Sequence, residues 1–408
     1  MSTHPPTLLR DRLPGPAPHE DSFTSRLRTP TVTARVGLWL GISFGVCFIT
    51  GLISHFLQHP PLFFTWPTRP VALYRWTQGL HVVTGTAAIP LLGVKLWSVY
   101  PKLFARVDLS SVRAALVTAV ERGSILVLVG AALFELLTGF FNTAQFYPWA
   151  FFFTTAHYAV AWVAIGALLV HIAVKLPIIR AALGVPVTST VNSDTLEVTP
   201  AAEVTPAVQP PGRGPTRRTL LRCTWIAAGV AVLATAGGTV PLLRKVSVLA
   251  ARTGDGPQGV PINRTAQVAN VQEKATAPDW AVVVTGPGGS RSFTLADLNA
   301  LPQSTQTLPI ACVEGWSADA VWTGVPVADL VAAVGGSTGA DVRFTSFDTG
   351  LYGSSVLPAR HARSTLTLLA TRLNGEVLTL DHGFPARLIA PSRPGVTQTK
   401  WVSKMDVL

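Results

Sequence analysis

Long runs of apolar residues divide the first 245 positions of the chain. They lie at about 35–57, 75–97, 118–141, 151–175 and 223–243. A helix that crosses a bilayer needs about 20 mostly apolar residues, because about 30 Å of hydrocarbon is covered at 1.5 Å per residue. Each run is long enough, so the pattern predicts five transmembrane helices surrounded by membrane lipid.

Beyond about residue 245 the pattern becomes that of a soluble domain of ordinary size. Short alternating runs separated by turn residues predict strands at 280–285, 308–313, 341–345, 379–380, 387–390 and 400–403. A turn is predicted at 286–290, a strand leading into a short helix at 292–300, and a helix at 325–334 that two glycines terminate. The fold class is therefore an all-α helix bundle followed by a mixed α+β domain.

The same pattern divides the chain into five segments. Residues 1–33 are polar and proline-rich, which predicts a disordered arm without a cleavable signal peptide. Residues 34–176 form a four-helix transmembrane domain, and 177–216, rich in Pro, Thr, Val and Ala, form a flexible linker. The fifth helix belongs to 217–244, and the soluble domain to 245–408.

Composition and charge agree with a membrane protein. Of the 408 residues, 48% are hydrophobic and only 13% are charged, which is too apolar for an ordinary soluble protein. The net charge of +11 raises nucleic acid as a partner, but the basic residues cluster in connections between helices, so no nucleic acid is expected.

The positions of those basic residues predict the orientation, since lysine and arginine favour the cytoplasmic side. Three segments carry most of them: Arg10, Arg12, Arg26, Arg28 and Arg35; Lys102, Arg106 and Arg113; Arg180, Arg213, Arg217, Arg218 and Arg222. The two intervening connections hold only Arg69. We therefore expect a multi-pass protein of the bacterial cytoplasmic membrane, with a cytoplasmic N-terminus and an extracytoplasmic C-terminal domain.

The sequence TRRTLLR at 216–222 directly precedes the fifth apolar run. It resembles an internal twin-arginine signal, which would make the twin-arginine export machinery a partner. That route carries folded proteins, which suits a domain loaded with a cofactor in the cytoplasm. The alternative is that Arg217 and Arg218 only anchor a helix at the cytoplasmic face.

Three histidines, His81, His157 and His171, fall inside predicted helices, where ionisable side chains are costly and usually functional. His157 and His171 are 14 residues apart, close to four turns or about 21 Å, and would face the same side. His81 and His157 reach similar depth and could grip one haem iron. The alternative is that they join helices by hydrogen bonds.

This bundle resembles the four-helix b-type cytochrome subunits of bacterial formate dehydrogenases and hydrogenases, which carry a histidine pair of this spacing on their fourth helix. The resemblance implies haem b at His81 and His157, and a second haem at His171. In that family the inner haem takes its other ligand from the inner end of the first helix, where residues 34–41 of this chain contain no histidine.

Cys312 is the one cysteine of three in polar surroundings, because Cys47 and Cys223 lie in apolar runs. It has no obvious disulfide partner, so it is either a buried thiol of the core or a ligand. The surrounding sequence is PIACVEGWS at 309–317, followed by WTGV at 322–325. A second block contains YGSS at 352–355, DHGFPAR at 381–387 and GVTQTKW at 395–401.

In these blocks the chain resembles the molybdopterin domain of the sulfite oxidase family, over roughly residues 260–408. The resemblance implies molybdenum bound by the Cys312 thiolate, a ligand suited to a soft metal site. It implies an active-site phenol at Tyr352 and a pterin held by His382, Arg387, Gln398, Thr399 and Lys400. It also suggests lesser contacts from Asn263, Ser346 and Asp348.

One departure bears on the substrate. The sulfite-oxidising members carry arginines within a few residues after the cysteine, whereas positions 313–317 here contain none. Sulfite is therefore not the expected substrate, and the selecting residues are expected in loops at 313–322 and 346–355.

The sequence thus predicts a membrane-bound molybdenum oxidoreductase that performs two-electron chemistry, such as oxygen-atom transfer, on a small molecule outside the cytoplasm. It would exchange electrons with haem b and a quinone or other carrier. The alternatives are an electron-transfer or assembly protein whose C-terminal domain lacks catalytic molybdenum, and a cofactor-free module that binds a partner. The direction of the reaction stays open at this point.

Overall fold

The computed structural model describes residues 23, 25–104, 111–193, 195–200, 214–251, 256–337 and 339–408, and the statements below concern these. The predicted disordered arm lies mostly outside them, as do residues 201–213 of the predicted linker. Arg10, Arg12, Arg106 and Arg213, which contributed to the predicted orientation, also lie outside.

The chain forms two compact units. The first consists of Met1–Gly41, Pro90–Val129 and Gly166–Ala227; the second consists of Ile42–Ile89, Gly130–Ile165 and Ala228–Leu408. The second unit therefore contains one half of the bundle together with the whole C-terminal domain, and contacts between those two parts lie within a single unit.

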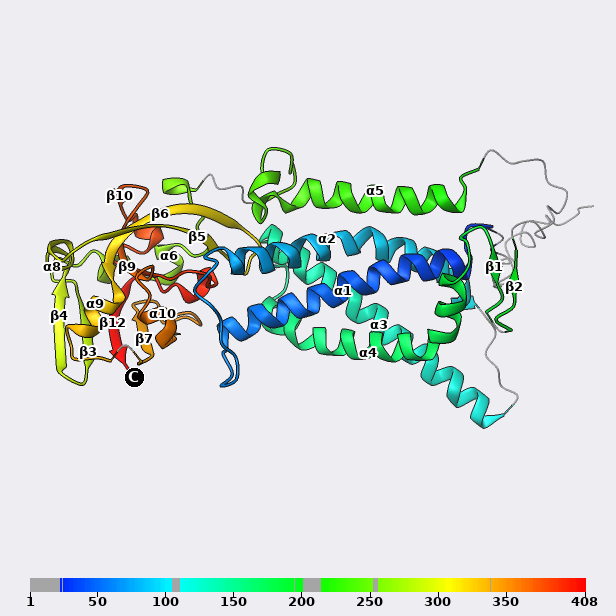
Figure 1. Cartoon of the computed structure of the whole chain (residues 1–408), viewed down its shortest axis with the longest axis horizontal. Helices are drawn as coiled ribbons and strands as arrows, with labels where there is room; N and C mark the ends of the chain where they lie inside the picture. The colour runs from blue at the N-terminus through cyan, green and yellow to red at the C-terminus, as the bar shows by residue number, and fades with distance from the viewer. Residues whose placement is uncertain are drawn as a thin grey trace, which may run out of the picture. The chain divides into compact units, whose positions relative to one another are not determined.

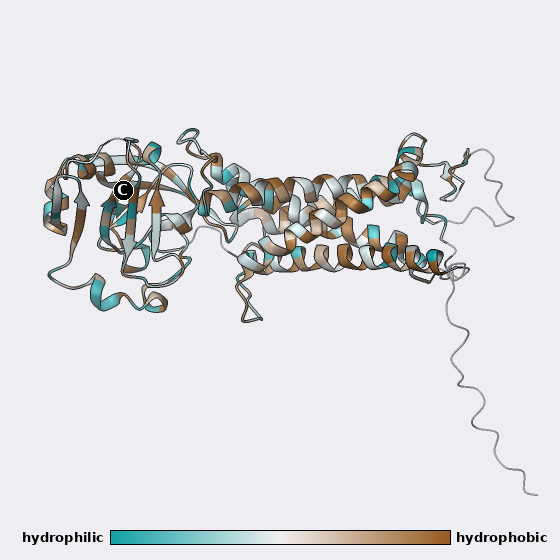
Figure 2. Ribbon diagram, turned by 90° about the horizontal axis from the view of Figure 1, so that it is seen from below, coloured by the Kyte–Doolittle hydropathy of each residue, from teal (hydrophilic) through white to brown (hydrophobic). Residues whose placement is uncertain are grey.

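Five helices are long and apolar enough to cross a membrane (Figure 1), as the hydrophobic runs predict. They are α1 (Pro30–Gln58), α2 (Leu73–Val99), α3 (Val112–Ala144), α4 (Phe153–Leu183) and α5 (Arg217–Thr235). Hydrophobic residues, drawn in brown in Figure 2, occur along the length of these helices. A short 3-10 helix, η2 (Tyr100–Phe104), follows α2, and a two-stranded hairpin of β1 (Thr190–Val191) and β2 (Val198–Thr199) follows α4.

The predicted ends of two helices were wrong. The α4 helix continues eight residues beyond the predicted 175, even though Pro177 lies inside it. The α5 helix already contains Arg217 and Arg218, and it ends at Thr235 rather than at 243. Gly237, Gly238 and Pro241 follow, in the short 3-10 turns η3 (Ala236–Gly238) and η4 (Pro241–Leu243). Glycine and proline favour such an ending, although the residues remain apolar.

The C-terminal domain is a mixed α+β fold, as predicted, and its strands form two five-stranded sheets. One sheet contains β5 (Ser304–Ala311), β6 (Ser317–Pro326), β9 (Leu368–Leu373), β10 (Glu376–Val377) and β11 (Arg387–Ile389). The other has the order β4 (Gly289–Thr294), β3 (Ala281–Gly286), β12 (Val402–Val407), β7 (Val342–Ser346) and β8 (Ser354–Leu357). The pairing of β12 with β3 is parallel, and the other pairs are antiparallel.

Short helices complete the domain: η5 (Pro257–Gly259), α6 (Ala266–Ala269), α7 (Gln272–Ala275), α8 (Leu295–Ala300), α9 (Val327–Ala332), α10 (Ala359–Ala362), η6 (Leu380–His382) and η7 (Gly395–Thr397). The α8 helix begins with a capping box, in which the side chains of Thr294 and Asp297 bond each other's backbone N–H. This local signal is what makes the predicted strand-to-helix passage at 292–300 correct.

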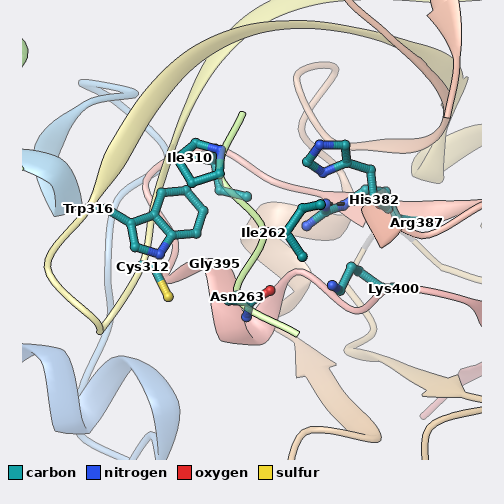
Figure 3. Close-up of a pocket in the computed structure, with 10 residues that line it drawn as sticks. Ile262, Asn263, Ile310, Cys312, Trp316, His382, Arg387, Gly395 and Lys400 are labelled. Carbon is teal, nitrogen blue, oxygen red and sulfur yellow. Dashed lines mark hydrogen bonds between the residues drawn. The ribbon is translucent and has the colours of Figure 1, made fainter. Parts of the chain in front are cut away.

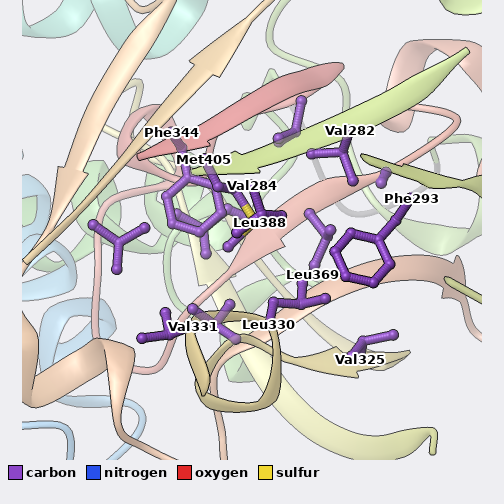
Figure 4. Packing of buried hydrophobic residues seen from close by; sticks show 14 of the residues in the cluster. Val282, Val284, Phe293, Val325, Leu330, Val331, Phe344, Leu369, Leu388 and Met405 are labelled. Atoms are coloured by element: carbon purple, nitrogen blue, oxygen red, sulfur yellow. The ribbon is translucent and has the colours of Figure 1, made fainter. Parts of the chain in front are cut away.

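A hydrophobic core joins the two sheets and α9. Figure 4 shows Val282, Phe344, Leu369, Leu388 and Met405 packed together there, and all are buried. Gly324 marks the closest approach of two strands, because a Cβ atom at this position would lie 2.2 Å from the carbonyl oxygen of Leu369. Only glycine fits between β6 and β9 at this point.

Two further predictions for the domain were wrong. Residues 379–380, predicted as a strand, lead into the 3-10 helix η6. The predicted substrate loop at 313–322 is shorter than expected, because residues from Ser317 onward form β6, the longest strand of the sheet. Its alternating burial comes from packing between β5 and β9, and β9 lies far from it in the sequence.

Candidate functional site

Cys312 lies directly after β5, at a tight turn that leads into β6. Its backbone N–H donates to the carbonyl of Trp316 at 2.8 Å, and the N–H of Gly315 donates back to the carbonyl of Cys312 at 3.1 Å. Gly315 has a φ of +78°, which glycine adopts without strain. The turn therefore fixes the backbone of Cys312. The whole residue is buried.

A pocket opens beside this cysteine. It is lined by three residues of the domain entry and seven of the two motif blocks: Pro261, Ile262, Asn263, Ile310, Cys312, Trp316, His382, Arg387, Gly395 and Lys400. Figure 3 shows the Cys312 sulfur on one side of this pocket and the basic side chains of His382, Arg387 and Lys400 on the other. The pocket thus has a thiol end and a cationic end.

Arg387, at the start of β11, is buried. Its Nη1 donates to the carbonyl of His382 at 3.0 Å and its Nη2 to that of Gln398 at 3.3 Å. Its guanidinium lies 5.1 Å from the ring centroid of Trp322. Burial lowers the pKa of Arg387 to about 9, which means that the protein supplies no carboxylate strong enough to offset the loss of water.

Lys400 and His382 lie at the same end of the pocket as Arg387. Burial, followed by repulsion from Arg387, lowers the pKa of Lys400 to about 7 and that of His382 to about 4. The Nζ of Lys400 donates to the carbonyls of Arg264 and Asp381, and the Nε2 of His382 lies 2.7 Å from the carbonyl of Pro257. Neutral carbonyls orient Lys400 and Arg387 but do not balance their positive charge, whereas His382 is neutral, so this end of the pocket favours an anion.

Two buried polar atoms beside the pocket support this conclusion. The Nε of Arg387 and the Oε1 of Gln398 have no hydrogen-bond partner among the described residues. The chemistry of the set, cations with one free donor and one free acceptor, fits a pterin that carries a phosphate group. Among the described residues of the chain, no cluster of three or more His, Cys, Asp or Glu side chains could hold a metal ion. A metal at Cys312 would therefore take its other ligands from a cofactor.

The remaining residues of the predicted set lie around the pocket rather than in its lining. Tyr352 packs beside Cys312, and burial followed by the charge of Cys312 raises the pKa of its phenol. Gln398 donates from Nε2 to the carbonyl of Arg393 at 3.1 Å, and Thr399 shares a hydrogen bond of 2.7 Å with Ser355. Both side chains are buried and shape the wall behind Arg387.

Of the three lesser cofactor contacts that the sequence suggested, one lies in the pocket lining and two lie outside it. Asn263 lines the pocket. Asp348 instead pairs with Arg264 at 2.8 Å, and Ser346 donates its hydroxyl to the carbonyl of Lys400 at 2.7 Å. Asp348 and Ser346 therefore support the segment around Lys400.

Sequence reasoning missed the aromatic wall of the site, formed by Trp316 and, behind Arg387, by Trp322. It also missed Arg393, a buried cation whose Nη2 donates to the carbonyl of Val356 at 3.1 Å and whose pKa burial lowers to about 10. The one sequence signal for Arg393 is its position between the stretches 381–387 and 395–401 of the second motif block.

The second candidate site lies between α2 and α4, within the unit that holds the C-terminal domain. The ring centroids of His81 and His157 are 6.2 Å apart, which leaves room for one metal ion with a bond of about 2 Å to each ring. His81 Nδ1 lies 2.9 Å from the carbonyl of Cys47, and His157 Nδ1 lies 2.9 Å from the hydroxyl of Thr138. Such bonds orient a ligating histidine and leave Nε2 for the metal.

Small residues surround this pair. A Cβ atom at Gly51 would lie 3.2 Å from His81 Cε1, and one at Gly139 would lie 3.5 Å from His157 Cε1. The residues therefore fit a haem in their donor set, although His157 Nε2 contacts the buried carboxylate of Glu135 at 3.1 Å, and that contact would have to give way.

His171 lies in the other unit, on α4, one turn before Lys175, whose amine pairs with Glu121. No other histidine occurs among the described residues of that unit. The described residues of this unit therefore offer no second histidine for a haem, and His171 stays a prediction as a haem ligand.

Comparison with known proteins supports the assignment of the C-terminal part. Residues 268–408 match the family described as the oxidoreductase molybdopterin binding domain. Mitochondrial sulfite oxidase of Homo sapiens is 33% identical over 153 residues, which cover 31% of this chain and 28% of that protein. The C-terminal part is therefore similar to the molybdopterin-binding domain that sulfite oxidases contain.

Two other similarities were found. YedZ1 of Azospira oryzae, assigned by name to a protein-methionine-sulfoxide reductase as a subunit, is 34% identical over 117 residues, 28% of this chain and 44% of YedZ1. The sulfane dehydrogenase SoxCD of Paracoccus pantotrophus covers 37% of this chain and 43% of its own at 22% identity and a TM-score of 0.30, too low a score to support a conclusion. This chain spans less than half the length of each of these proteins.

Proposed function

We propose that this chain is a membrane-bound molybdenum-dependent oxidoreductase that carries out oxygen-atom transfer outside the cytoplasm. One observation supports this more than any other: a single pocket joins the Cys312 thiol at one end to Arg387, Lys400 and His382 at the other. A thiolate suits molybdenum, and buried cations without a balancing carboxylate suit the phosphate of a pterin.

Each residue then has a distinct task. Cys312 holds the metal, and Arg387 with Lys400 binds the phosphate, while His382 fixes Arg387 through its carbonyl. Tyr352, whose raised pKa keeps its phenol protonated, can donate a hydrogen bond to an oxygen that reacts near Cys312. Bound molybdenum supplies the two-electron chemistry, which no side chain of the protein can perform.

For the substrate we favour a sulfoxide, such as that of oxidised methionine. The name of YedZ1 points to this class, and the turn after Cys312 lacks the arginines expected for sulfite. The overall reaction would be R–S(=O)–R′ + 2 e⁻ + 2 H⁺ → R–S–R′ + H₂O. A reduced quinone or other carrier supplies the electrons in this proposal, by way of haem b at His81 and His157.

The membrane arrangement belongs to the same proposal. The five apolar helices would span the bacterial cytoplasmic membrane with the N-terminus inside. The C-terminal domain would then lie outside, exported in folded form by the twin-arginine machinery through Arg217 and Arg218. The Arg217 guanidinium donates to the carbonyls of Thr188 and Ser189, at 2.8 and 2.9 Å, so it also serves a local structural role.

Combined metal and pterin analysis of the purified chain tests the proposal. We expect about one molybdenum and one pterin per chain, with the molybdenum lost in Cys312→Ser and retained in the control Cys223→Ser, whose cysteine is exposed on α5. A metal-free wild-type chain, purified from cells that make the cofactor, would refute the enzyme. It would favour instead an electron-transfer or partner-binding membrane protein.

The substrate is tested separately with reduced, molybdenum-loaded protein. We expect methionine sulfoxide, free or in a peptide, to be converted to the sulfide, with two electrons consumed per product. Oxidation of sulfite at a comparable rate would contradict the proposed substrate class but not the cofactor.

A further inference from the structure

The turn at residues 313–315, which we call the docking turn, lies against the ends of two helices of the bundle. The carbonyl of Val313 accepts hydrogen bonds from Asn142 Nδ2 at 3.0 Å and, more weakly, from Gln78 Nε2 at 3.5 Å. The Glu314 carboxylate accepts from Gln145 Nε2 at 2.9 Å. All of these residues belong to the same compact unit, so the contact is a feature of one body.

Gly315 brings the docking turn into close packing with the same helices. A Cβ atom added here would lie 2.7 Å from Thr143 Cγ2 and 3.2 Å from Val82 Cγ2. The φ of +78° also favours glycine. Both the backbone conformation and the available space therefore fit a turn that is pressed against α2 and α3.

Further contacts around the docking turn widen this interface. Arg75 on α2 pairs with Asp319 at 2.7 Å, and Trp66 donates from its indole N–H to the hydroxyl of Ser392 at 2.9 Å. Ser317 donates its hydroxyl to the carbonyl of Thr239 at 3.0 Å. The domain is thus held at several separate points, which opposes a swinging motion about any one of them.

The docking turn is also connected to both histidines of the second candidate site. Gln78 precedes His81 by three residues on α2, which corresponds to about 4.5 Å along the helix axis. Asn142 follows Thr138 by four residues on α3, about 6 Å, and Thr138 shares a hydrogen bond of 2.9 Å with His157 Nδ1. The carbonyl next to Cys312 thus has a short covalent and hydrogen-bonded connection to each histidine.

We infer that the docking turn forms a rigid interface with the bundle, which we call the seat, and that the seat keeps Cys312 close to the His81–His157 pair. Asn142 and Gln78 are then positioning residues for electron exchange between the two sites. The redox part of this inference rests on the proposed function; the seat itself does not. Haem held by His81 and His157 would supply electrons one at a time, and two of them would be needed at the Cys312 site for the two-electron reduction of one sulfoxide.

The seat also explains the departure from the sulfite-oxidising pattern. The positions that follow the cysteine are engaged with α2 and α3, and Glu314 is occupied by Gln145 and by the Trp316 indole N–H at 3.1 Å. This turn is therefore not available to bind an anionic substrate. Arginines here would have to enter the interface with the bundle, where burying their charge is costly.

A disulfide trap tests the seat without any cofactor. A Cβ atom at Gly315 would lie 3.6 Å from Thr143 Cβ, within the range of 3.5–4.5 Å that disulfides show. We expect the double variant Thr143→Cys with Gly315→Cys to form this bond within minutes of mild oxidation in detergent, identified by mass spectrometry of the linked peptide.

Two controls define the result. Leu137→Cys with Gly315→Cys places the first cysteine on the exposed side of α3 and should not form the bond. The single variant Gly315→Cys detects any bond to the native Cys312. If the 143–315 bond does not form, or forms no faster than the 137–315 bond, the seat is refuted.

The positioning role is tested with Asn142→Leu combined with Gln78→Met, which remove the donors at nearly constant volume. We expect unchanged molybdenum content and haem spectrum, and at least tenfold slower reoxidation of prereduced haem by methionine sulfoxide. Thr77→Val is the matched control, because within the described part of the chain the Thr77 hydroxyl bonds its own helix at the carbonyl of Tyr74 and no other group. Reoxidation within twofold of wild type would overturn the positioning role. A chain without molybdenum or haem would instead refute the proposed function, and the disulfide would still decide the seat.

Discussion

Retention of the pterin should depend on pH through Lys400. In the structure the Lys400 amine is buried beside Arg387, and burial lowers its pKa from 10.5 to about 7. A shift of this size corresponds to about 5 kcal/mol of cost for the charged form. A bound phosphate dianion would favour the charged amine, so binding takes up a proton whenever the free protein has its amine neutral.

The sign of the effect follows from this linkage. Below pH 7 the amine already carries its proton, so affinity for the pterin should be flat. Above pH 7 binding requires proton uptake, so affinity should fall by up to tenfold per pH unit. In Lys400→Arg this fall should be absent over the same pH range, because a guanidinium keeps its proton to much higher pH than an amine. Lys400→Met should bind weakly throughout.

The assay is the fraction of pterin retained after gel filtration between pH 6 and 10, measured by the fluorescence of the oxidised pterin. The Cys312→Ser background removes the metal bond, so that retention reports the cationic end alone. A wild-type profile that is flat from pH 6 to 9, or one that Lys400→Arg leaves unchanged, would refute the phosphate-binding role of this lysine.

Three further predictions follow from particular contacts. His157→Ala should abolish a b-type reduced-minus-oxidised absorbance signal of the membranes while His171→Ala retains it, and an unchanged spectrum in the first variant would exclude His157 as a ligand. His382 is buried in its neutral form with its pKa lowered to about 4, so the pterin-free protein should lose up to about 3 kcal/mol of stability as the pH falls from 6.5 to 4. Chemical denaturation should show a flatter profile for His382→Gln, and an equal slope would contradict this linkage. Gly324→Ala should lower the Tm by roughly 10 °C through its clash with Leu369, whereas Gly339→Ala, which has ordinary contacts, should leave it unchanged; equal melting temperatures would show that the strands can separate at no cost.

Part of the candidate site could be predicted from the sequence, because its residues lie in short motifs. Cys312, His382, Arg387 and Lys400 were each found in a motif block, and the structure brings all four to one pocket. Tyr352, Gln398 and Thr399 were found by the same blocks but lie behind or beside the lining. A motif gives chain order and spacing, whereas the direction of a side chain depends on strands that pair from elsewhere.

By itself the sequence determined the five apolar helices and the mixed α+β domain, because hydrophobic length and alternation are properties of neighbouring residues. It also determined the chemical identity of the groups at Cys312 and Arg387. Only the tertiary structure decided that α5 ends early, that residues 317–326 form a central strand, and that the docking turn meets Asn142 and Gln78. Those contacts join residues more than 170 positions apart, and their geometry follows from how whole helices and sheets pack.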